Sequence, residues 1–377
     1  MEKTVLGILI VVLLGGFIFI TQKRKSTDET IKIGAIFALS GDAAAWGEDE
    51  LKATQLAINE ANAEGGINGK KIELIVEDAP GTEKFDQAIT TYRKLVEVNK
   101  VRAVIGPTWD DAAQAVAPVT DQEKVILISP DVTTSVEKDK DFKYFFTAWT
   151  PVASEMERLA EYVKERGWAK IAVVNNADLF SATVAGAFTD QAKNLGLTIY
   201  QTAIPNTGTK DFRAYITKLK SRDVDAVYAE FDNSASKCPF LKQAHELGLK
   251  KPFISTSSTQ AQDILNQCAN LLEGVHYAYQ KQGDKYTTLL AKYKAKYNQD
   301  PATPAVANAY DTTEMLISLM REGKLSADEL RDGLLHISHY SGATGEGLGF
   351  DAKGALTMPQ SSFIIKTVRS GAFVVAE

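Results

Sequence analysis

The chain has 377 residues, of which 45% are hydrophobic and 24% are charged, and its formal net charge is −6. This length exceeds what one hydrophobic core usually organises, so we expect two lobes or domains. The acidic balance argues against a nucleic-acid-binding protein, which needs positive charge massed on one face, and no such large basic patch is seen in the sequence. The composition is that of a globular protein.

Residues 1–30 differ from everything after them. Residues 5–20 form an unbroken apolar or glycine run, preceded by Lys3 and followed by a basic cluster at 23–25. As a helix this run is about 24 Å long, slightly shorter than the hydrocarbon core of a membrane. No small-x-small cleavage pattern follows it, so we interpret it as an uncleaved signal-anchor, with a cleaved signal peptide as the alternative. Either reading places the remaining chain outside the cytoplasm.

Apolar runs and amphipathic segments then alternate along the chain. Strands are predicted at 31–39, 70–78, 101–106 and 125–130, and helices between them, one with Leu51, Ile58 and Ala61 on one face and others at 83–98 and 110–120. After Pro151 the cycle repeats, with helices at 153–167, 180–196, 211–222 and 237–248 and strands at 170–176, 198–205, 225–231 and 252–258. The segment 274–280 leads into helices around 286–298, 304–321 and 327–337, a glycine-rich hairpin at 341–357 and a final pair of strands.

This alternation predicts the fold class. Parallel strands require crossover connections, so repeated strand–helix units indicate parallel sheets with helices on both faces. Two such series indicate an α/β protein with two doubly wound parallel-sheet lobes. The helices and strands that follow the second series indicate that the chain crosses between the lobes more than once, which makes a hinge.

Polar and aromatic side chains follow the predicted strand ends in both series. Open parallel sheets bind ligands beyond the carboxyl ends of their strands. Trp46, Asp110 and Asp131 lie in such loops of the first series, and Phe180 and Asp232 in loops of the second. Ser, Asp and Asn there could serve only as helix N-caps. Their placement at the same strand ends of both lobes favours a binding site.

The stretch IGPTWDDAA, from 105 to 113, contains two adjacent acids at one of these strand ends. We expect Asp110 to be both the N-cap of the next helix and a wall of the site. We expect Asp111 to provide only a favourable charge in the first turn of that helix.

Catalytic and metal-binding motifs are missing from the sequence. There is no nucleophile elbow, phosphate-binding loop or zinc-protease motif, so we expect neither an enzyme nor a cofactor. His336 and His339 have helical spacing, but no Cys or carboxylate cluster lies near them, and we expect no metal site. The two cysteines, Cys238 and Cys268, could form one disulfide in an exported protein, or remain two buried thiols.

Several long stretches resemble one known family. They include IKIGAIFALSGDAAAWGEDELKATQLAINEANAEGGINGKKIELIVED, VIGP followed by VILISP, LKQAHELGL and TGEGLGFDAKG. These are similar to the type I periplasmic solute-binding proteins of the leucine/isoleucine/valine-binding group, which serve ABC importers. The resemblance covers residues from about 31 to 377.

The resemblance implies two lobes joined by three crossings, with a ligand in a cleft that closes by hinge motion. The crossings are expected near 146–151, 277–282 and 336–344. Lobe 1 would comprise 31–148 plus 282–338, and lobe 2 would comprise 149–281 plus 339–377, after the N-terminal segment 1–30.

The resemblance also implies roles for individual residues. Trp46 corresponds to an aromatic against the ligand side chain, and Phe180 to an aromatic from lobe 2. Thr133, with the neighbouring amides of Asp131 and Val132, corresponds to the group that holds a ligand carboxylate. The family's Ser at the place of Asp110 is here an acid, which would repel that carboxylate.

A second departure concerns the Glu that receives the ligand ammonium in amino-acid binders. It is expected near Ala235 or Ser236, and neither is acidic. An ordinary α-amino acid is therefore not the ligand we expect. Asp110, with Asp131 and Asp232, suits a ligand with a cation or several hydrogen-bond donors, such as an amine, an amide, a urea-like compound or a polyol.

The functional expectation is an extracytoplasmic solute-binding protein that captures a small polar ligand, an amino acid, amide, amine or similar compound, in a cleft between the lobes and delivers it to the permease subunits of an ABC importer. It would be anchored to the cytoplasmic membrane by residues 5–20. The alternative is a ligand-sensing receptor ectodomain that uses the same two-lobed clamp and would need a separate signalling partner.

Overall fold

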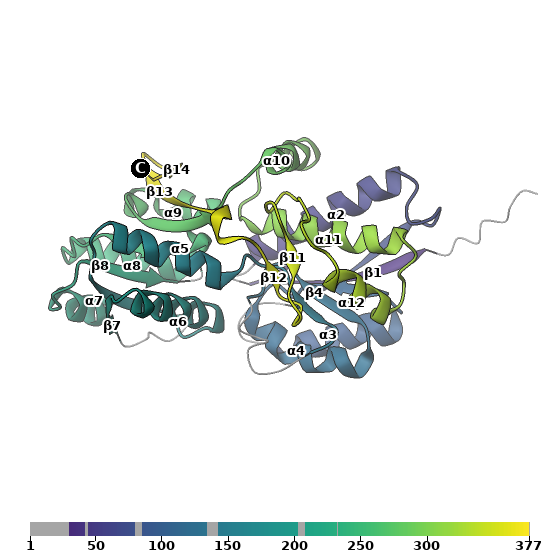
Figure 1. The fold of residues 1–377 in the computed structure, drawn as a ribbon, viewed down its shortest axis with the longest axis horizontal. Helices are drawn as coiled ribbons and strands as arrows, with labels where there is room; N and C mark the ends of the chain where they lie inside the picture. Colours follow the sequence, from purple (N-terminus) through teal and green to yellow (C-terminus); the bar gives the residue numbers. More distant parts are fainter. Residues whose placement is uncertain are drawn as a thin grey trace, which may run out of the picture. The chain divides into compact units, whose positions relative to one another are not determined.

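The computed structural model of the chain (Figure 1) describes residues 30–41, 44–79, 85–133, 142–202, 208–231 and 233–376, without the side chains of residues 85 and 86. The chain divides into two units, 1–30 and 31–377, and the second contains all the secondary structure described below. The expected membrane segment at 5–20 lies outside the described residues. Within the described part of the chain, no helix combines the length and apolarity needed to cross a membrane.

The first sheet is wholly parallel and has the strand order β2-β1-β3-β4-β5. Its strands are β1 (Ile31–Phe37), β2 (Ile72–Asp78), β3 (Ala103–Ile105), β4 (Ile126–Ser129) and β5 (Phe145–Thr147). Its helices are α2 (Ala44–Ala63), α3 (Phe85–Arg93), which continues as a π-helical turn (Lys94–Val98), and α4 (Asp110–Glu123). The residues of β3, β4 and β5 are all buried, as strands covered by helices on both faces must be. This confirms the predicted doubly wound arrangement.

The second sheet is mixed and has the order β14-β13-β10-β9-β8-β6-β7. Its parallel strands are β6 (Lys170–Asn175), β7 (Thr198–Gln201), β8 (Ala226–Glu230), β9 (Phe253–Ser255) and β10 (His276–Gln280). The C-terminal strands β13 (Phe363–Arg369) and β14 (Ala372–Val375) add to one edge in antiparallel pairing. Its helices are α5 (Val152–Glu165), α6 (Leu179–Asn194), α7 (Arg213–Lys220), α8 (Ser234–Glu246) and α9 (Gln262–Leu272), the last preceded by a 3-10 turn (Ser257–Gln260).

Helix α9 was not expected from the sequence. It packs against α8, and the two helices are joined by a disulfide between Cys238 and Cys268, whose Cα atoms are 5.7 Å apart. Of the two readings of the cysteines that the sequence left open, the structure has the bridge.

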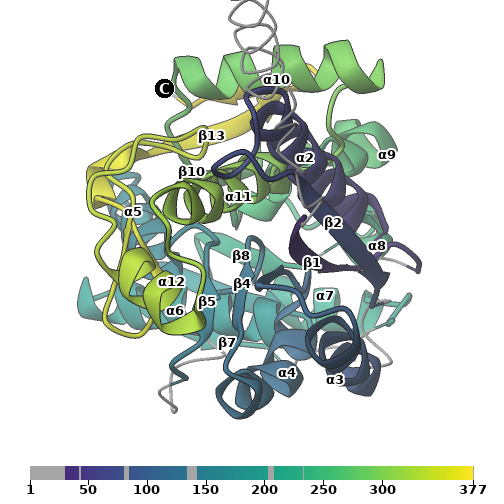
Figure 2. The same cartoon turned by 90° about the vertical axis from the view of Figure 1, so that its right-hand side faces the viewer.

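Three later helices return to the first sheet: α10 (Asp284–Tyr297), α11 (Ala305–Arg321) and α12 (Ala327–Leu335). Helices α2 and α11 lie side by side (Figure 2). The short hairpin of β11 (Gly349–Phe350) and β12 (Leu356–Thr357) also packs here, with the Phe350 ring 5.5 Å from that of Phe146.

This hairpin changes the expected lobe boundary. Leu348, Phe350, Leu356 and Met358 belong to the same buried core as β1 and β4, whereas 339–377 was expected wholly in lobe 2. The apolar side chains of the hairpin bury against the nearer sheet, so the third crossing lies after Met358, at the 3-10 turn Gln360–Ser362, and not near 336–344. The chain also passes from one sheet to the other before α5 and between β10 and α10.

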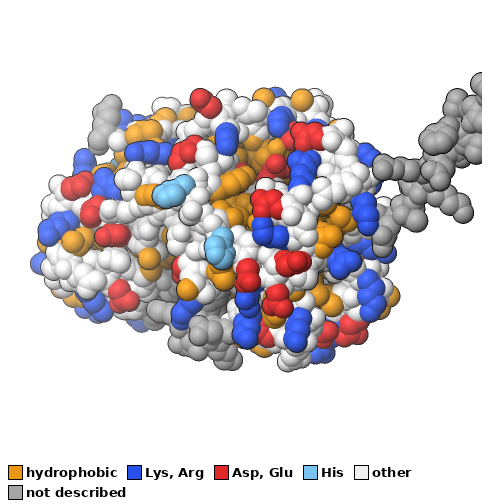
Figure 3. Space-filling model, turned by 45° about the vertical axis from the view of Figure 1, so that its right-hand side comes forward, with side chains coloured by type: hydrophobic (Ala, Val, Ile, Leu, Met, Phe, Trp, Pro, Cys, Tyr) orange, Lys and Arg blue, Asp and Glu red, His pale blue; other side chains and the backbone are white. Residues whose placement is uncertain are grey.

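The surface in Figure 3 carries acidic and basic side chains interspersed on the face shown. On that face no large field of one sign gathers, as the sequence also indicated.

Candidate functional site

Three tryptophans meet where the two lobes are in contact. Trp46, near the start of α2, has its ring 6.1 Å from the ring of Trp109 and 6.1 Å from that of Trp149. Trp109 comes directly before α4, and Trp149 lies in the first crossing between the lobes. Trp46 and Trp149 belong to the same buried hydrophobic core as Phe212 and Phe231 of the second lobe, and Trp109 packs against that core. We call Trp46, Trp109 and Trp149 the tryptophan cluster.

Three buried acids lie close to one another in the first lobe: Glu50, Asp110 and Asp131, which we call the acid cluster. Their exposed fractions are 0%, 2% and 6%. Burial raises the pKa of Glu50 to about 8, although a hydrogen bond from the Thr108 hydroxyl, at 2.5 Å, opposes the shift. Burial, and then the charges of Glu50 and Asp110, raise the pKa of Asp131 well above its usual range.

Asp110 is held by Thr133. Its Oδ1 accepts hydrogen bonds from the Thr133 backbone amide at 2.9 Å and from the Thr133 hydroxyl at 2.5 Å. The sequence analysis expected Asp110 to be the N-cap of α4, and this is wrong. The N-cap is Trp109, whose side chain makes no capping hydrogen bond. Of the donors that the resemblance assigns to a ligand carboxylate, those of Thr133 are engaged by a carboxylate of the chain itself, and the amides of Asp131 and Val132 donate to the Ser129 hydroxyl at 3.3 and 3.1 Å.

Four buried polar atoms of this region have no hydrogen-bond partner among the described residues. Two are carboxylate oxygens, Glu50 Oε1 and Asp131 Oδ2, and two are the indole nitrogens of Trp109 and Trp149. A buried polar atom without a hydrogen-bond partner is unfavourable by about 1–3 kcal/mol, so each such atom needs an explanation, for example a ligand that it contacts.

The second lobe contributes a polar network in which most groups are satisfied. Glu230, at the end of β8, accepts hydrogen bonds from the hydroxyls of Ser255 at 2.7 Å and Ser258 at 2.9 Å, and its Oε1 lies 3.7 Å from Lys237 Nζ. Glu155 accepts from the amide and hydroxyl of Ser257, and burial raises its pKa to about 8. The hydrogen-bond and ion-pair partners of the Glu230 carboxylate are therefore all in the second lobe.

Two helix N-termini of the second lobe are met by acceptors of the first. The Asp111 carboxylate accepts a hydrogen bond from the backbone amide of Leu179, the first residue of α6. The Ala302 carbonyl accepts from the amide of Gln262, the first residue of α9, at 2.7 Å. Asp111 was expected to act only within its own helix, but the fold brings α6 against α4 and gives it a partner in the other lobe.

Most of the expected site residues are brought together, but not all. Trp46, Asp110 and Thr133 lie in or beside the two clusters, with Asp131 in the acid cluster and Val132 fully buried next to it. Phe180 does not join them, because it packs against the core around β6 and α6. Asp232 lies outside the described residues.

Three residues of the site were missed in the sequence. Glu50 lies one helical turn after Trp46 on the same face of α2, a spacing that could have been used. Trp109 directly precedes Asp110, and Trp149 lies within the crossing that was expected at 146–151. The signal was present in each case, but only the folded chain shows that these side chains meet.

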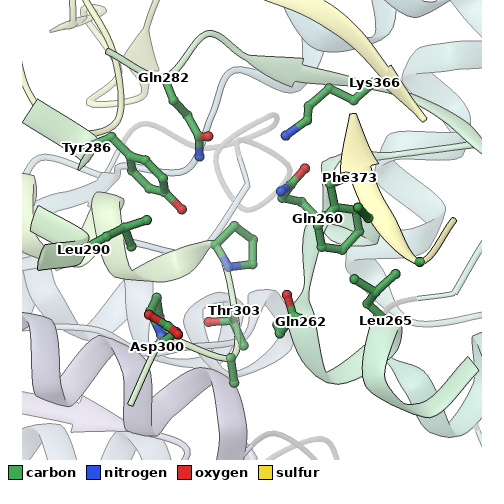
Figure 4. Close-up of a pocket in the computed structure, with 15 residues that line it drawn as sticks. Gln260, Gln262, Leu265, Gln282, Tyr286, Leu290, Asp300, Thr303, Lys366 and Phe373 are labelled. Carbon is green, nitrogen blue, oxygen red and sulfur yellow. The ribbon is translucent and has the colours of Figure 1, made fainter. Parts of the chain in front are cut away.

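A cavity of about 480 Å³ lies between α10, the segment 300–304, α9 and the β13–β14 hairpin, and no residue of either cluster lines it (Figure 4). Among the described residues, no group of three or more His, Cys, Asp and Glu side chains is arranged to hold a metal ion.

Comparison with known proteins gives relatives along almost the whole described unit. The "Leucine-, isoleucine-, valine-, threonine-, and alanine-binding protein" of Pseudomonas aeruginosa is 26% identical over 339 residues, which is 87% of each chain. The crystal structure of the substrate-binding protein of a branched-chain amino acid transporter from Streptococcus pneumoniae, in complex with isoleucine, matches with a TM-score of 0.80 and 28% identity, covering 92% of this chain and 99% of that one.

A more distant structure shows the same fold. The solute-binding protein of an ABC transporter from R. palustris, in complex with 4-hydroxybenzoate, matches with a TM-score of 0.82 at 18% identity, over 93% of this chain and 96% of that one. A family model described as "Periplasmic binding protein" matches residues 30–371. With the two-lobed fold that the resemblance implied, this match shows that the chain belongs to the periplasmic binding protein family.

Proposed function

We propose that this protein is an extracytoplasmic solute-binding protein that captures a small ligand bearing a protonated amine, between its two lobes, for an ABC importer. The relatives named above are binding proteins of amino acid and other solute transporters, which supports the importer over a receptor ectodomain. The observation that supports the amine is the acid cluster, in which Glu50 and Asp131 each keep one buried oxygen without a hydrogen-bond partner.

The contacts of Asp110 argue against a ligand α-carboxylate at Thr133. A ligand carboxylate there would have to displace Asp110 from the Thr133 amide and hydroxyl. A second carboxylate beside the acid cluster would also make ionisation of Glu50 and Asp131 still less favourable, because like charges a few ångströms apart in a dry interior repel strongly. A cation reverses both effects, because it is attracted by the acids and leaves the bonds of Thr133 in place.

The tryptophan cluster complements this charge. The face of an indole ring attracts a cation, by about 0.5–2 kcal/mol depending on how dry the site is. Trp46 and Trp149 are almost fully buried and lie at the lobe contact, so a cation held there would be desolvated. Acid oxygens that ionise when a cation arrives, on one side, and aromatic faces on the other are the two features that bind an alkylammonium group.

Ligand entry requires the lobes to separate. The three crossings are the positions about which the lobes can turn, as in other two-lobed binding proteins. The hydrogen bonds of Asp111 with Leu179 and of Ala302 with Gln262 hold the arrangement seen here. We therefore assign these contacts to the closed form.

The partners and location follow from the same proposal. The permease subunits of an importer would receive the closed protein at the membrane surface. Residues 5–20 would direct export and tether the protein to the cytoplasmic membrane, an inference that rests on the sequence alone. Size comparison of the secreted and membrane-bound protein on a denaturing gel, with and without these residues, tests it.

A thermal-shift screen of the full chain tests the ligand class. The panel should hold alkylamines, polyamines, quaternary ammonium compounds and guanidines, with leucine, isoleucine, urea and sugars as the comparison set. A specific ligand at 100 times its Kd adds about 2.7 kcal/mol to the free energy of unfolding. We expect one or more of the cationic compounds to raise the unfolding temperature, and the comparison set to leave it unchanged. Tight leucine binding that Asp110→Ser leaves unchanged would overturn the amine assignment while keeping the transport role.

A further inference from the structure

The cavity of about 480 Å³ between α10, the segment 300–304, α9 and the β13–β14 hairpin is a second place where a small molecule fits (Figure 4). Its volume is within the range of small-molecule sites, about 300–1,000 Å³. Gln282, Tyr286 and Leu290 line it from the first lobe, and Gln260 and Lys366 line it from the second. We call it the hinge cavity, because it lies beside the crossing between β10 and α10.

Lys366 is the unusual residue of the hinge cavity. It lies on β13, only 9% of it is exposed, and its ammonium makes no hydrogen bond or ion pair with any residue in the described ranges. Its only close partner there is the ring of Tyr279, whose centroid is 5.0 Å from Nζ. A buried ammonium without an anionic partner is strongly unfavourable, so such a group calls for a counter-ion. Figure 4 shows its ammonium directed into the cavity.

Neutral hydrogen-bond groups lie around this ammonium. The Gln260 side-chain oxygen accepts a hydrogen bond from the Tyr277 hydroxyl at 2.6 Å, which fixes the amide orientation and turns its NH₂ group away from Tyr277. On the opposite wall, Gln282 donates to the Tyr279 hydroxyl at 3.3 Å, and the hydroxyl of Tyr286 points toward the centre (Figure 4). An anion beside Lys366 therefore meets amide and hydroxyl donors as well.

The rest of the wall is apolar or already paired. Leu265, Leu290 and Phe373 give the cavity a hydrophobic side, which suits an organic group more than a bare inorganic ion. Asp300, at the rim, is held by Lys294 at 2.9 Å and so does not neutralise Lys366. One cation, a few donors and a hydrophobic wall match a ligand with a single carboxylate and a short apolar body.

We propose that the hinge cavity is a second binding site, distinct from the tryptophan and acid clusters, that takes a small organic monocarboxylate. Its carboxylate pairs with Lys366 and the Gln260 amide, and its apolar part lies against Leu265, Leu290 and Phe373. Because both lobes line the cavity, an occupant bridges them and stabilises the closed arrangement. The two sites thus select ligands of opposite charge.

Isothermal titration calorimetry of the full chain in mild detergent tests this. The probes are butyrate, benzoate and inorganic phosphate, with butylamine as the probe of the other site. We expect butyrate or benzoate to bind, Lys366→Gln to weaken that binding at least tenfold, and Lys193→Gln, the same change at an exposed position of α6, to leave it unchanged. Butylamine binding should be the same in all three proteins.

A second variant distinguishes loss of the binding site from misfolding of the K366Q protein. Ala372→Trp, at an exposed position of the hairpin that lines the cavity, fills the space without touching the charge and should weaken carboxylate binding as much. Equal binding in the wild type, K366Q and A372W would overturn the site. Absence of carboxylate binding would also overturn it, and tighter binding of phosphate than of benzoate would overturn the monocarboxylate class. Failure of butylamine alone would count against the proposed function and not against this site.

Discussion

Replacing Asp131 by Asn separates the effect of the acid cluster on the stability of the free protein from its effect on amine binding. Asn keeps the shape of the protonated acid but cannot ionise. In the free protein, burial and the neighbouring Glu50 and Asp110 raise the pKa of Asp131, so the ionised form is disfavoured in the folded chain. In the complex with an amine, the same carboxylate is needed as an anion. The substitution should therefore act in opposite directions on stability and on binding.

The magnitudes follow from the contacts. A hydrogen bond to a charged group contributes about 1.5–3 kcal/mol, so the amine should bind D131N about 10- to 150-fold more weakly. The free variant should gain about 1–3 kcal/mol of unfolding free energy at pH 7, because the wild type must either keep an unpaired charge on the buried Asp131 or take up a proton in order to fold. The gain should vanish as the pH falls to the usual Asp pKa of 3.8, because the acid is then protonated in both the folded and the unfolded chain.

The assay combines urea unfolding at pH 7 and pH 4 with calorimetric titration of the best amine from the screen. Asp190→Asn, the same change at an exposed position of α6, is the matched control and should alter neither quantity. A D131N variant that is less stable at pH 7 than the wild type, or that binds the amine equally well, would refute the assignment of Asp131 to the ligand cation.

Three further outcomes are expected. Replacing both Cys238 and Cys268 by Ser should lower the free energy of unfolding by about 3–4 kcal/mol by the chain-entropy relation, since the bridge spans 30 residues; guanidinium unfolding measures it. Burial raises the pKa of Glu155 to about 8, so its contribution is stabilising at low pH and is lost as the pH rises from its usual 4.5 to 8. The thermal midpoint should fall from pH 5 to pH 8, and less steeply in Glu155→Gln; equal slopes would show that Glu155 is not responsible. Asp111→Ala should remove the bond to Leu179, which exists only while the lobes meet, and so weaken ligand binding by about five- to tenfold. Small-angle X-ray scattering of the free variant should show a larger radius of gyration, and an unchanged radius and affinity would contradict this role.

The repeated strand–helix pattern predicted much of the fold correctly because it depends on local periodicity. A buried parallel strand needs a continuous apolar run, and a covering helix needs an apolar stripe, and both are visible in a short window of sequence. The tertiary structure added α9, the antiparallel pairing of β13 and β14, and the packing of the β11–β12 hairpin on the first lobe. The strand pairing and the hairpin packing have no local signature, since each depends on which sheet edge or core lies nearest. Helix α9 does carry a helical pattern, with Ile264, Leu265, Cys268 and Leu272 buried, and the sequence analysis missed it.

The residues of the candidate site also fall into those that the sequence indicated and those that only the tertiary structure showed. The sequence by itself placed Trp46, Asp110 and Asp131 in loops that follow strand ends of the first series, and the family resemblance added Thr133 and the acid that would repel a carboxylate ligand. Only the tertiary structure decided that Asp110 occupies the donors of Thr133, that Glu50 and two further tryptophans complete the site, and that Asp111 bonds to the other lobe. The physical reason is that strand and helix patterns are written in neighbouring residues, whereas the partner of a buried charge is chosen by packing between segments far apart in the chain.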